Sequence, residues 1–187
     1  MMQKLLQKKL KLNYSKDVFD IVQFGSSIIE GRAPNDLDIA VIFYKIPLKD
    51  QLNQAQKIKK QIQENVDISV HVNSFDLYSL FDKSNFAKES VLFGKSLISG
   101  NYFSERFGFN PRVQIAYSLK SFEKKDKVRF NYMLNGKGGA YGLLRKYNGV
   151  LLNPGLIEIL PDYEEIFVKS IKKITSDFKS KKIFLLK

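Results

Sequence analysis

The spacing of apolar and polar residues changes along the chain, and each change predicts a different element. Short apolar runs over 18–24 and 36–43 are typical of buried strands. The stretch KDQLNQAQKIKKQIQE at 49–64 predicts a polar helix, and NVDISVHV at 65–72 alternates as a half-buried strand with its apolar residues at the even positions. Two strands, a long helix and a third strand predict an α/β sheet with helices packed on it.

The second half of the chain has a different pattern. The turn Asn-Pro-Gly between the apolar runs of 150–160 predicts a hairpin. The stretch 162–178 predicts an amphipathic helix with acidic residues first and lysines later, as the helix dipole favours, and a basic tail follows it. Further helices are expected at 111–122, where Asn110-Pro111 is a typical helix start, and at 124–134 and 139–147.

Two other segments complete the expected organisation. Residues 2–12 indicate a basic amphipathic helix, and 74–100 is expected to be helical in part before a strand-like end. The predicted fold class is therefore α/β (α+β): a small mixed sheet with flanking helices in a domain over 1–100, followed by a basic, mainly helical region with a hairpin over 101–187.

Composition narrows the class of protein. The 187 residues include no cysteine, which excludes disulfides and zinc–thiolate sites. No apolar run is long enough for a transmembrane helix, and lysines interrupt the N-terminal apolar pattern, so we expect no membrane association and a cytoplasmic location.

Most of the positive charge lies in the C-terminal part of the sequence. The formal net charge is +12; residues 1–99 hold 14 basic and 11 acidic side chains, whereas residues 100–187 hold 17 and 8. This excess favours a polyanionic partner, nucleic acid first. Solvated lysine faces without any partner are the alternative, and charge alone does not decide between them.

Two carboxylates at the start of an apolar strand are the clearest chemical feature. Asp36 and Asp38 are two residues apart, so a strand presents both on one face, where like charges repel. A third acid, Asp67, follows about 30 residues later between Val66 and Ile68. Because consecutive strands of one sheet can bring all three acids to one edge, the pattern predicts a site for Mg²⁺, a hard cation that prefers oxygen ligands.

A glycine–serine turn precedes the acids. Gly25 and Ser26 end the first apolar run, and Ser26 is placed to cap a short helix after it. Glycine lets a backbone approach a phosphate closely, and a serine hydroxyl with neighbouring N–H groups can bind phosphate oxygens.

Together these motifs resemble the nucleotidyltransferase superfamily that includes DNA polymerase beta, and its small minimal members most closely. The family signature is an apolar residue, Gly, Gly or Ser, a spacer of nine to thirteen residues, and then Asp, an apolar residue and a second acid. Phe24-Gly25-Ser26, a nine-residue spacer and Asp36-Leu37-Asp38-Ile39 match it, and Asp67 matches the third acid. The resemblance covers roughly residues 18–72.

The resemblance implies a role for each matching residue. Asp36 and Asp38 would hold the metal ions that bind a nucleoside triphosphate, and Asp67 would ligate the catalytic metal and help to deprotonate the acceptor hydroxyl. Gly25 and Ser26 would hold the triphosphate. The implied enzyme is a Mg²⁺-dependent nucleotidyltransferase that joins a nucleoside monophosphate to an acceptor and releases pyrophosphate.

The sequence departs from the family in ways that affect the nucleotide and the acceptor. Ile29 stands where many minimal members have an arginine, and Asn35 replaces a serine; Arg32 is a candidate to replace the missing cation. The acceptor stays open between RNA such as tRNA, a protein side chain and a small molecule, and the basic second half favours RNA. A non-catalytic module that binds nucleic acid or protein on the same scaffold is the alternative.

Other groups have two interpretations each. His71 shares a strand face with Asp67, but a partly buried structural histidine is favoured. The aromatic residues around Arg106 suit base stacking or a packed junction, and packing is favoured. A basic cluster suits phosphate binding or an exposed helix face, and both stay open; it comprises Lys120, Lys124, Lys125, Lys127 and Arg129.

Overall fold

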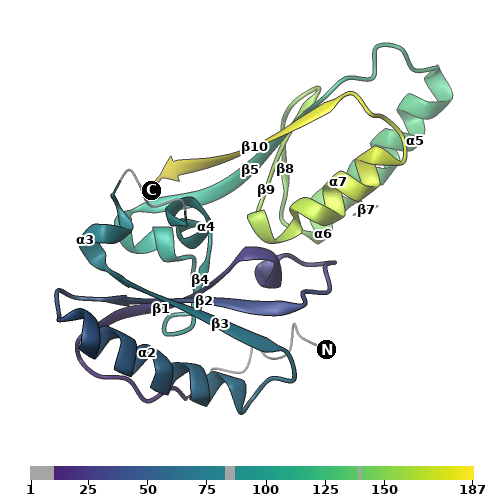
Figure 1. Cartoon of the computed structure of the whole chain (residues 1–187). Helices are drawn as coiled ribbons and strands as arrows, with labels where there is room; N and C mark the ends of the chain where they lie inside the picture. Colours follow the sequence, from purple (N-terminus) through teal and green to yellow (C-terminus); the bar gives the residue numbers. More distant parts are fainter. Residues whose placement is uncertain (1–10, 83–86, 139) are drawn as a thin grey trace. The chain divides into compact units, whose positions relative to one another are not determined.

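The computed structural model describes residues 11–82, 87–138 and 140–187. The chain forms two compact units, one of Met1–Ile28 with Arg32–Gly108 and one of Ile29–Gly31 with Phe109–Lys187 (Figure 1). The helix predicted over 2–12 falls almost entirely outside the described residues. Among the described residues, every helix is too short or too polar to cross a lipid bilayer.

The first unit is built on a mixed four-stranded sheet in the order β3-β2-β1-β4. Its strands are β1 (Val18–Phe24), β2 (Asp36–Phe43), β3 (Ser69–Asp76) and β4 (Lys95–Ser96). β1 and β2 are antiparallel, whereas β3 runs parallel to β2 after the crossover helix α2 (Leu48–Gln63). The predictions of strands at 18–24 and 36–43 and of a helix at 49–64 are confirmed to within one residue.

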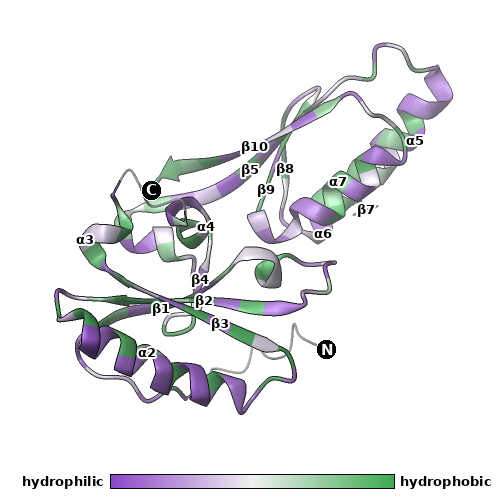
Figure 2. Cartoon of the chain, viewed as in Figure 1, coloured by the Kyte–Doolittle hydropathy of each residue, from purple (hydrophilic) through white to green (hydrophobic). Residues whose placement is uncertain are grey.

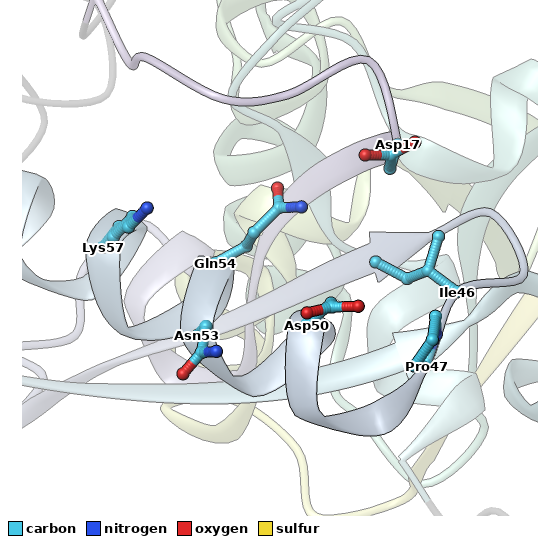
Figure 3. A pocket seen from close by; sticks show the side chains of 7 residues that line it. All are labelled: Asp17, Ile46, Pro47, Asp50, Asn53, Gln54 and Lys57. Atoms are coloured by element: carbon cyan, nitrogen blue, oxygen red, sulfur yellow. The ribbon is translucent and has the colours of Figure 1, made fainter.

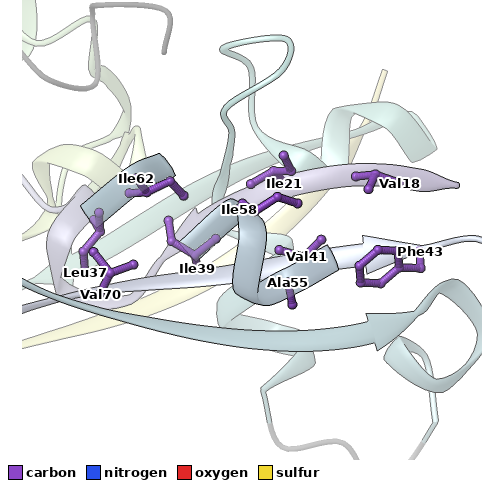
Figure 4. Packing of buried hydrophobic residues seen from close by; sticks show 10 residues of the cluster. All are labelled: Val18, Ile21, Leu37, Ile39, Val41, Phe43, Ala55, Ile58, Ile62 and Val70. Carbon is purple, nitrogen blue, oxygen red and sulfur yellow. The ribbon is translucent and has the colours of Figure 1, made fainter. Parts of the chain in front are cut away.

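One face of this sheet packs against α2, as the apolar spacing of both elements requires. Ala55, Ile58 and Ile62 recur on one side of the helix and are buried against the odd-numbered residues of β2 (Figure 4). Val70 of β3 joins them. In Figure 2 hydrophilic residues alternate with these hydrophobic ones along α2, which is the pattern of a helix with one buried side.

The opposite face holds the even-numbered residues of β2 and a second apolar cluster. Ala40 and Ile42 are buried there with Leu80, Val91 and Phe103. These last three come from the short helices α3 (Leu77–Leu80), α4 (Lys88–Leu92) and η2 (Phe103–Phe107). The first unit therefore has three layers, with the sheet between α2 and these short helices.

A buried acidic residue ties β1 to the connecting segments. The side chain of Asp20 is fully buried; its Oδ1 accepts hydrogen bonds from Ser96 Oγ at 2.6 Å and from the Ile21 backbone N–H at 2.8 Å. Arg106 Nε lies 2.8 Å from Asp20 Oδ2, and the guanidinium lies 4.9 Å from the centre of the Phe19 ring. Arg106, Phe103 and Phe107 thus pack on Phe19 within the first unit, whereas Phe109 belongs to the second unit; the packed junction favoured from the sequence stays a prediction.

The second unit contains an antiparallel four-stranded sheet in the order β10-β5-β9-β8. The strands are β5 (Phe109–Tyr117), β8 (Val150–Asn153), β9 (Leu156–Ile159) and β10 (Phe178–Leu186). Its helices are α5 (Lys124–Asn135), α6 (Leu143–Lys146), η3 (Pro161–Tyr163) and α7 (Glu164–Lys172), and a small ribbon of β6 (Gly136–Lys137) and β7 (Ala140–Tyr141) follows α5. Phe130, Leu134, Phe167 and Ile171 bring α5 and α7 onto Val113 and Ile115 of the sheet.

The expectation of a mainly helical second half is therefore wrong, although the hairpin at 150–160 and the helix starting at 124 are confirmed. Within the stretch 111–122, residues 111–117 belong to β5 rather than to a helix, and 118–122 are turn and irregular structure. Val113, Ile115 and Tyr117 alternate with Arg112, Gln114 and Ala116 and pack on one side. Pro111 is tolerated because β5 at that point pairs with β10 but not with β9. The proline lacks a backbone N–H, and with one neighbouring strand this costs at most one ladder hydrogen bond.

Two further helix predictions are wrong in extent. Only Leu143–Lys146 is helical within 139–147, of which residue 139 is not described, because Gly136–Lys137 and Ala140–Tyr141 pair as a ribbon first. The helix predicted over 162–178 ends at Lys172, and the basic tail after it is the edge strand β10. Lysines are common on edge strands because they discourage pairing with other chains.

Candidate functional site

Asp36 and Asp38 begin β2, on the face that also carries Ala40 and Ile42. Both carboxylates are half-buried, whereas the residues after them are fully buried. Phe24, the last residue of β1, pairs with Asp38 across the antiparallel ladder. The strand thus places the two acids side by side at the end of the apolar cluster, as the sequence predicts.

The turn after Phe24 places Gly25 directly against Asp38. Gly25 has φ +75°, in the left-handed region that favours glycine, and begins the short helix η1 (Gly25–Ile28). A Cβ atom built on it would lie 2.7 Å from Asp38 Oδ2. Glycine is therefore required here twice, once for the backbone angle and once for the space that the carboxylate occupies.

The environment of Asp38 disfavours its charge. Burial raises the pKa of the Asp38 carboxyl, and the negative charge of Asp36 raises this pKa further. The pKa is lowered in part by His71. A carboxylate pair that repels itself in this way gains most from a cation placed beside it.

The parallel pairing of β2 with β3 brings two polar side chains to the acids. Ser69 is the partner of Asp36 and His71 the partner of Asp38. His71 Nε2 lies 3.4 Å from Ser69 Oγ, a hydrogen bond whose direction depends on the tautomer. His71 is exposed, so the expectation of a partly buried structural histidine is wrong. Ser69 was not singled out from the sequence, where only the register of the strands would have indicated it.

Asp67 is exposed and lies in a bend before β3, not within the strand predicted over 65–72. The side chain of Gln63 at the end of α2 binds this segment. Its side-chain amide donates to the carbonyl oxygens of Val66 at 3.2 Å and Ile68 at 2.9 Å, and its Oε1 accepts from the Val70 N–H at 3.1 Å. β3 starts at Ser69, which pairs with Asp36, the first residue of β2.

The two carboxylates fit a cation that is shared with a substrate phosphate better than a cation held by protein side chains alone. Among the residues that the structure describes, no three His, Cys, Asp or Glu side chains are grouped closely enough to hold a metal by themselves. Mg²⁺ in nucleotide sites is usually held by one or two carboxylates together with substrate phosphates. Asp36 and Asp38, with the space that Gly25 leaves beside Asp38, fit a cation that binds together with a phosphorylated substrate.

The remaining predicted residues, Ser26 and Arg32, precede the two acids in the sequence. Ser26 lies inside η1 and does not cap it, so that prediction is wrong. The hydroxyl that fixes the turn belongs to Ser27, which donates to the Phe24 carbonyl at 3.0 Å and accepts from Gln23 Nε2 at 2.9 Å. Arg32 is exposed in the loop before Asp36.

A hollow at the opposite end of β2 is a separate feature (Figure 3). It has a volume of about 320 Å³ and is lined by Asp17, Ile46, Pro47, Asp50, Asn53, Gln54 and Lys57. From Asp38 to Phe43 the strand advances about 16 Å, and Ile46 follows beyond that end. The hollow therefore belongs to the start of α2, and its acids are suitable controls for those of β2.

No protein-family model matches the chain, and comparisons with the curated proteins and with the solved structures gave no match. The resemblance to nucleotidyltransferases accordingly rests on the residues and their arrangement alone.

Proposed function

We propose that the chain is a Mg²⁺-dependent nucleotidyltransferase that uses a nucleoside triphosphate. The observation that supports this most is the fit of Gly25 against the Asp38 carboxylate, with Asp36 on the same face and the pKa of Asp38 raised. A structural role accounts poorly for two half-buried like charges beside a glycine turn, because their repulsion costs stability. A phosphate-bound cation removes that repulsion.

One group of residues would bind the triphosphate and its metal, and another would take the proton of the acceptor. Asp36 and Asp38 would hold the metal, while Ser26 and the backbone around Gly25 would bind phosphate oxygens. When bound, Mg²⁺ supplies charge neutralisation at the phosphates. An acceptor oxygen would form a bond to the α-phosphorus as the bond to pyrophosphate breaks. The acceptor's proton would pass to Asp67, as the resemblance implies, or to His71, the exposed partner of Asp38.

The reaction is tested by incubating the chain with each of the four nucleoside triphosphates, labelled at the α-phosphate, and Mg²⁺. Parallel reactions contain total RNA, a protein lysate or a small-molecule extract. We expect label in one acceptor class, pyrophosphate in equal amount and no transfer with a chelator present. Asp67→Asn and His71→Gln variants identify the proton acceptor, because only its loss should alter the pH dependence of the rate. Absence of transfer in every arm would leave a binding module and overturn the proposal.

A methyl group at Gly25 should impair transfer more than it impairs folding. In Gly25→Ala the new Cβ meets Asp38 Oδ2, a side-chain end that can move away, so we expect a displaced carboxylate and a rate lower by about tenfold or more. The positive φ alone costs roughly 1–2 kcal/mol.

Gly100→Ala is the matched control for this substitution. Gly100 has φ +80° but nothing within 4 Å of its ideal Cβ, so it carries the same backbone strain without a carboxylate to displace. Thermal unfolding should shift similarly in the two variants, whereas only Gly25→Ala should lose transfer. Equal rates in the two variants would show that the close approach of Gly25 to Asp38 has no catalytic role.

A further inference from the structure

Positive charge in the second unit is concentrated in the segment that contains α5. Residues 120–146 hold eight basic and two acidic side chains, a net of +6, which is half the formal charge of the chain. α5 buries Phe130 and Leu134 on one side. Lys125, Val128, Arg129 and Tyr132 are exposed and recur at spacings of three and four, so they form one stripe opposite the buried side.

Aromatic rings lie among these cations. Tyr132 on α5 is 51% exposed, and Tyr141 in β7 is 98% exposed. Tyr141 also has φ 67°, a left-handed backbone conformation that is uncommon for a large residue other than glycine. The β6–β7 ribbon thus holds the Tyr141 ring fully in solvent at some conformational cost, and backbone strain of this kind is frequent at binding sites.

The β6–β7 ribbon is fixed to the end of α5, which places Tyr141 next to the last turn of the helix that carries Tyr132. Gly136 follows Tyr132 by four residues, about 6 Å along the helix, and pairs with Tyr141 across the β6–β7 ribbon. An ideal Cβ on Gly142 would clash with the Asn135 carbonyl carbon and with the Leu134 carbonyl oxygen. The chain after Tyr141 therefore packs directly on the last turn of α5.

We propose that one surface of the second unit binds single-stranded RNA. It consists of the α5 stripe of Lys125, Val128, Arg129 and Tyr132, together with Tyr141 of the β6–β7 ribbon. Lysine and arginine side chains bind successive phosphates, and exposed tyrosines stack on bases. Stacking requires bases that are not already paired, which is the usual state of RNA loops and ends. That the bound strand is the acceptor of transfer rests on the function proposed above, whereas the binding does not.

The charge on this surface is available for a polyanion. Arg129 lies 3.6 Å from Asp126 one turn earlier, but its side chain is 73% exposed, and such a surface pair is weak and easily screened. An anionic membrane is the other polyanion that a basic helix can meet. Membrane helices bury a broad apolar face in the lipid, however, and the large apolar or aromatic residues exposed on α5 are only Val128 and Tyr132.

The test is fluorescence anisotropy of a labelled, unstructured oligouridylate titrated with the full chain at several salt concentrations. Lys125→Gln with Arg129→Gln should weaken binding and lower the slope of log affinity against log salt by about 1.4, the value for two phosphate contacts on a single strand. Tyr132→Ala and Tyr141→Gly should each weaken binding about tenfold without altering that slope. Glycine at position 141 also suits the positive φ, so folding is retained.

Lys179→Gln with Lys181→Gln is the matched control, because it removes the same charge from exposed lysines of β10. We expect its affinity to equal that of the parent. Equal weakening by both double variants, no saturable binding at low salt, or preference for anionic vesicles over the oligouridylate would each overturn the assignment. Asp38→Asn should lose transfer and bind RNA as the parent does. RNA binding by a parent chain that transfers no label would overturn the enzymatic proposal alone, and transfer by a chain that fails the binding tests would overturn the RNA surface alone.

Discussion

Replacing Asp38 by asparagine is expected to abolish Mg²⁺-dependent transfer and to leave the fold at least as stable as that of the parent chain. Asparagine keeps the size of the side chain, so the contact with Gly25 is preserved. It removes one of the two charges that would hold the cation. Losing a group that stabilises developing charge commonly costs 10²–10³-fold in rate, and we expect a loss of at least about 10²-fold here.

The stability of this variant follows from the sign of the pKa shift. The pKa of Asp38 is raised in the folded chain, mainly by burial and then by Asp36, above its ordinary value of 3.8. The folded state therefore holds the proton more tightly than the unfolded state does, and the free energy of unfolding falls as the pH rises through the folded pKa. At neutral pH the ionised carboxylate opposes folding. Asparagine removes that penalty, so the melting temperature without metal should equal or exceed that of the parent.

With Mg²⁺ and a non-hydrolysable triphosphate present, we expect the parent to have a higher melting temperature than Asp38→Asn. Ligands that bind only the folded state raise the melting temperature, so the parent should be stabilised and Asp38→Asn should not. Asp50→Asn is the control, because it removes an acid from the hollow at the other end of β2 and should retain both transfer and the metal response. Transfer at the parental rate by Asp38→Asn would show that the metal assignment is wrong.

The elements that the sequence predicted correctly are those whose pattern is local. The strands at 18–24 and 36–43 and the helix at 49–64 carry their burial pattern in their own residues, and the pair Asp36 and Asp38 could be placed on one face from alternation alone. One strand that depends on a distant partner was missed. β10 is a basic tail by composition and becomes a strand only through its nine-residue pairing with β5.

The residues of the candidate site likewise fall into those that the sequence placed correctly and one, Asp67, that it did not. Gly25, Asp36 and Asp38 come together through one turn and one antiparallel pair of strands. The turn and both strands were predicted from the sequence, whereas their antiparallel pairing was not. Asp67 was expected in a strand, but β3 begins only at Ser69, where it pairs with Asp36, the first residue of β2. That limit is set by the register between two strands that a helix separates. The alternation of 65–72 alone does not show it.

The buried residue Asp20 gives the largest expected effect on stability, through its partner Arg106. Its Oδ1 accepts two hydrogen bonds, but its Oδ2 accepts none among the described residues, although Arg106 Nε lies 2.8 Å away as an ion pair of poor hydrogen-bond geometry. Arg106→Ala leaves this oxygen buried without a counter-charge. Breaking a buried pair from one side costs 3–5 kcal/mol, and we expect about 3 kcal/mol because the Arg106 side chain is 35% exposed.

The pH dependence of that loss identifies its cause. Burial raises the pKa of Asp20 above 3.8, whereas Ser96, the charge of Arg106 and the Ile21 N–H lower it. A raised folded pKa means that stability is greatest at acid pH and falls as the pH rises through it. Without Arg106 the pKa of Asp20 rises further, so the fall extends to higher pH. Urea unfolding should therefore show a smaller difference between Arg106→Ala and the parent in acid than at neutral pH.

A second substitution separates the charge of Arg106 from its packing on Phe19. Asp20→Asn keeps an oxygen that can accept from Ser96 and Ile21 but removes the buried charge. In the Arg106→Ala background it should restore part of the lost free energy of unfolding at neutral pH, and a double-mutant cycle measures the amount. If the loss were the same at every pH and Asp20→Asn restored nothing, the contribution of Arg106 would come from its contact with the Phe19 ring instead. Asp20 would then be held by Ser96 and the Ile21 N–H alone.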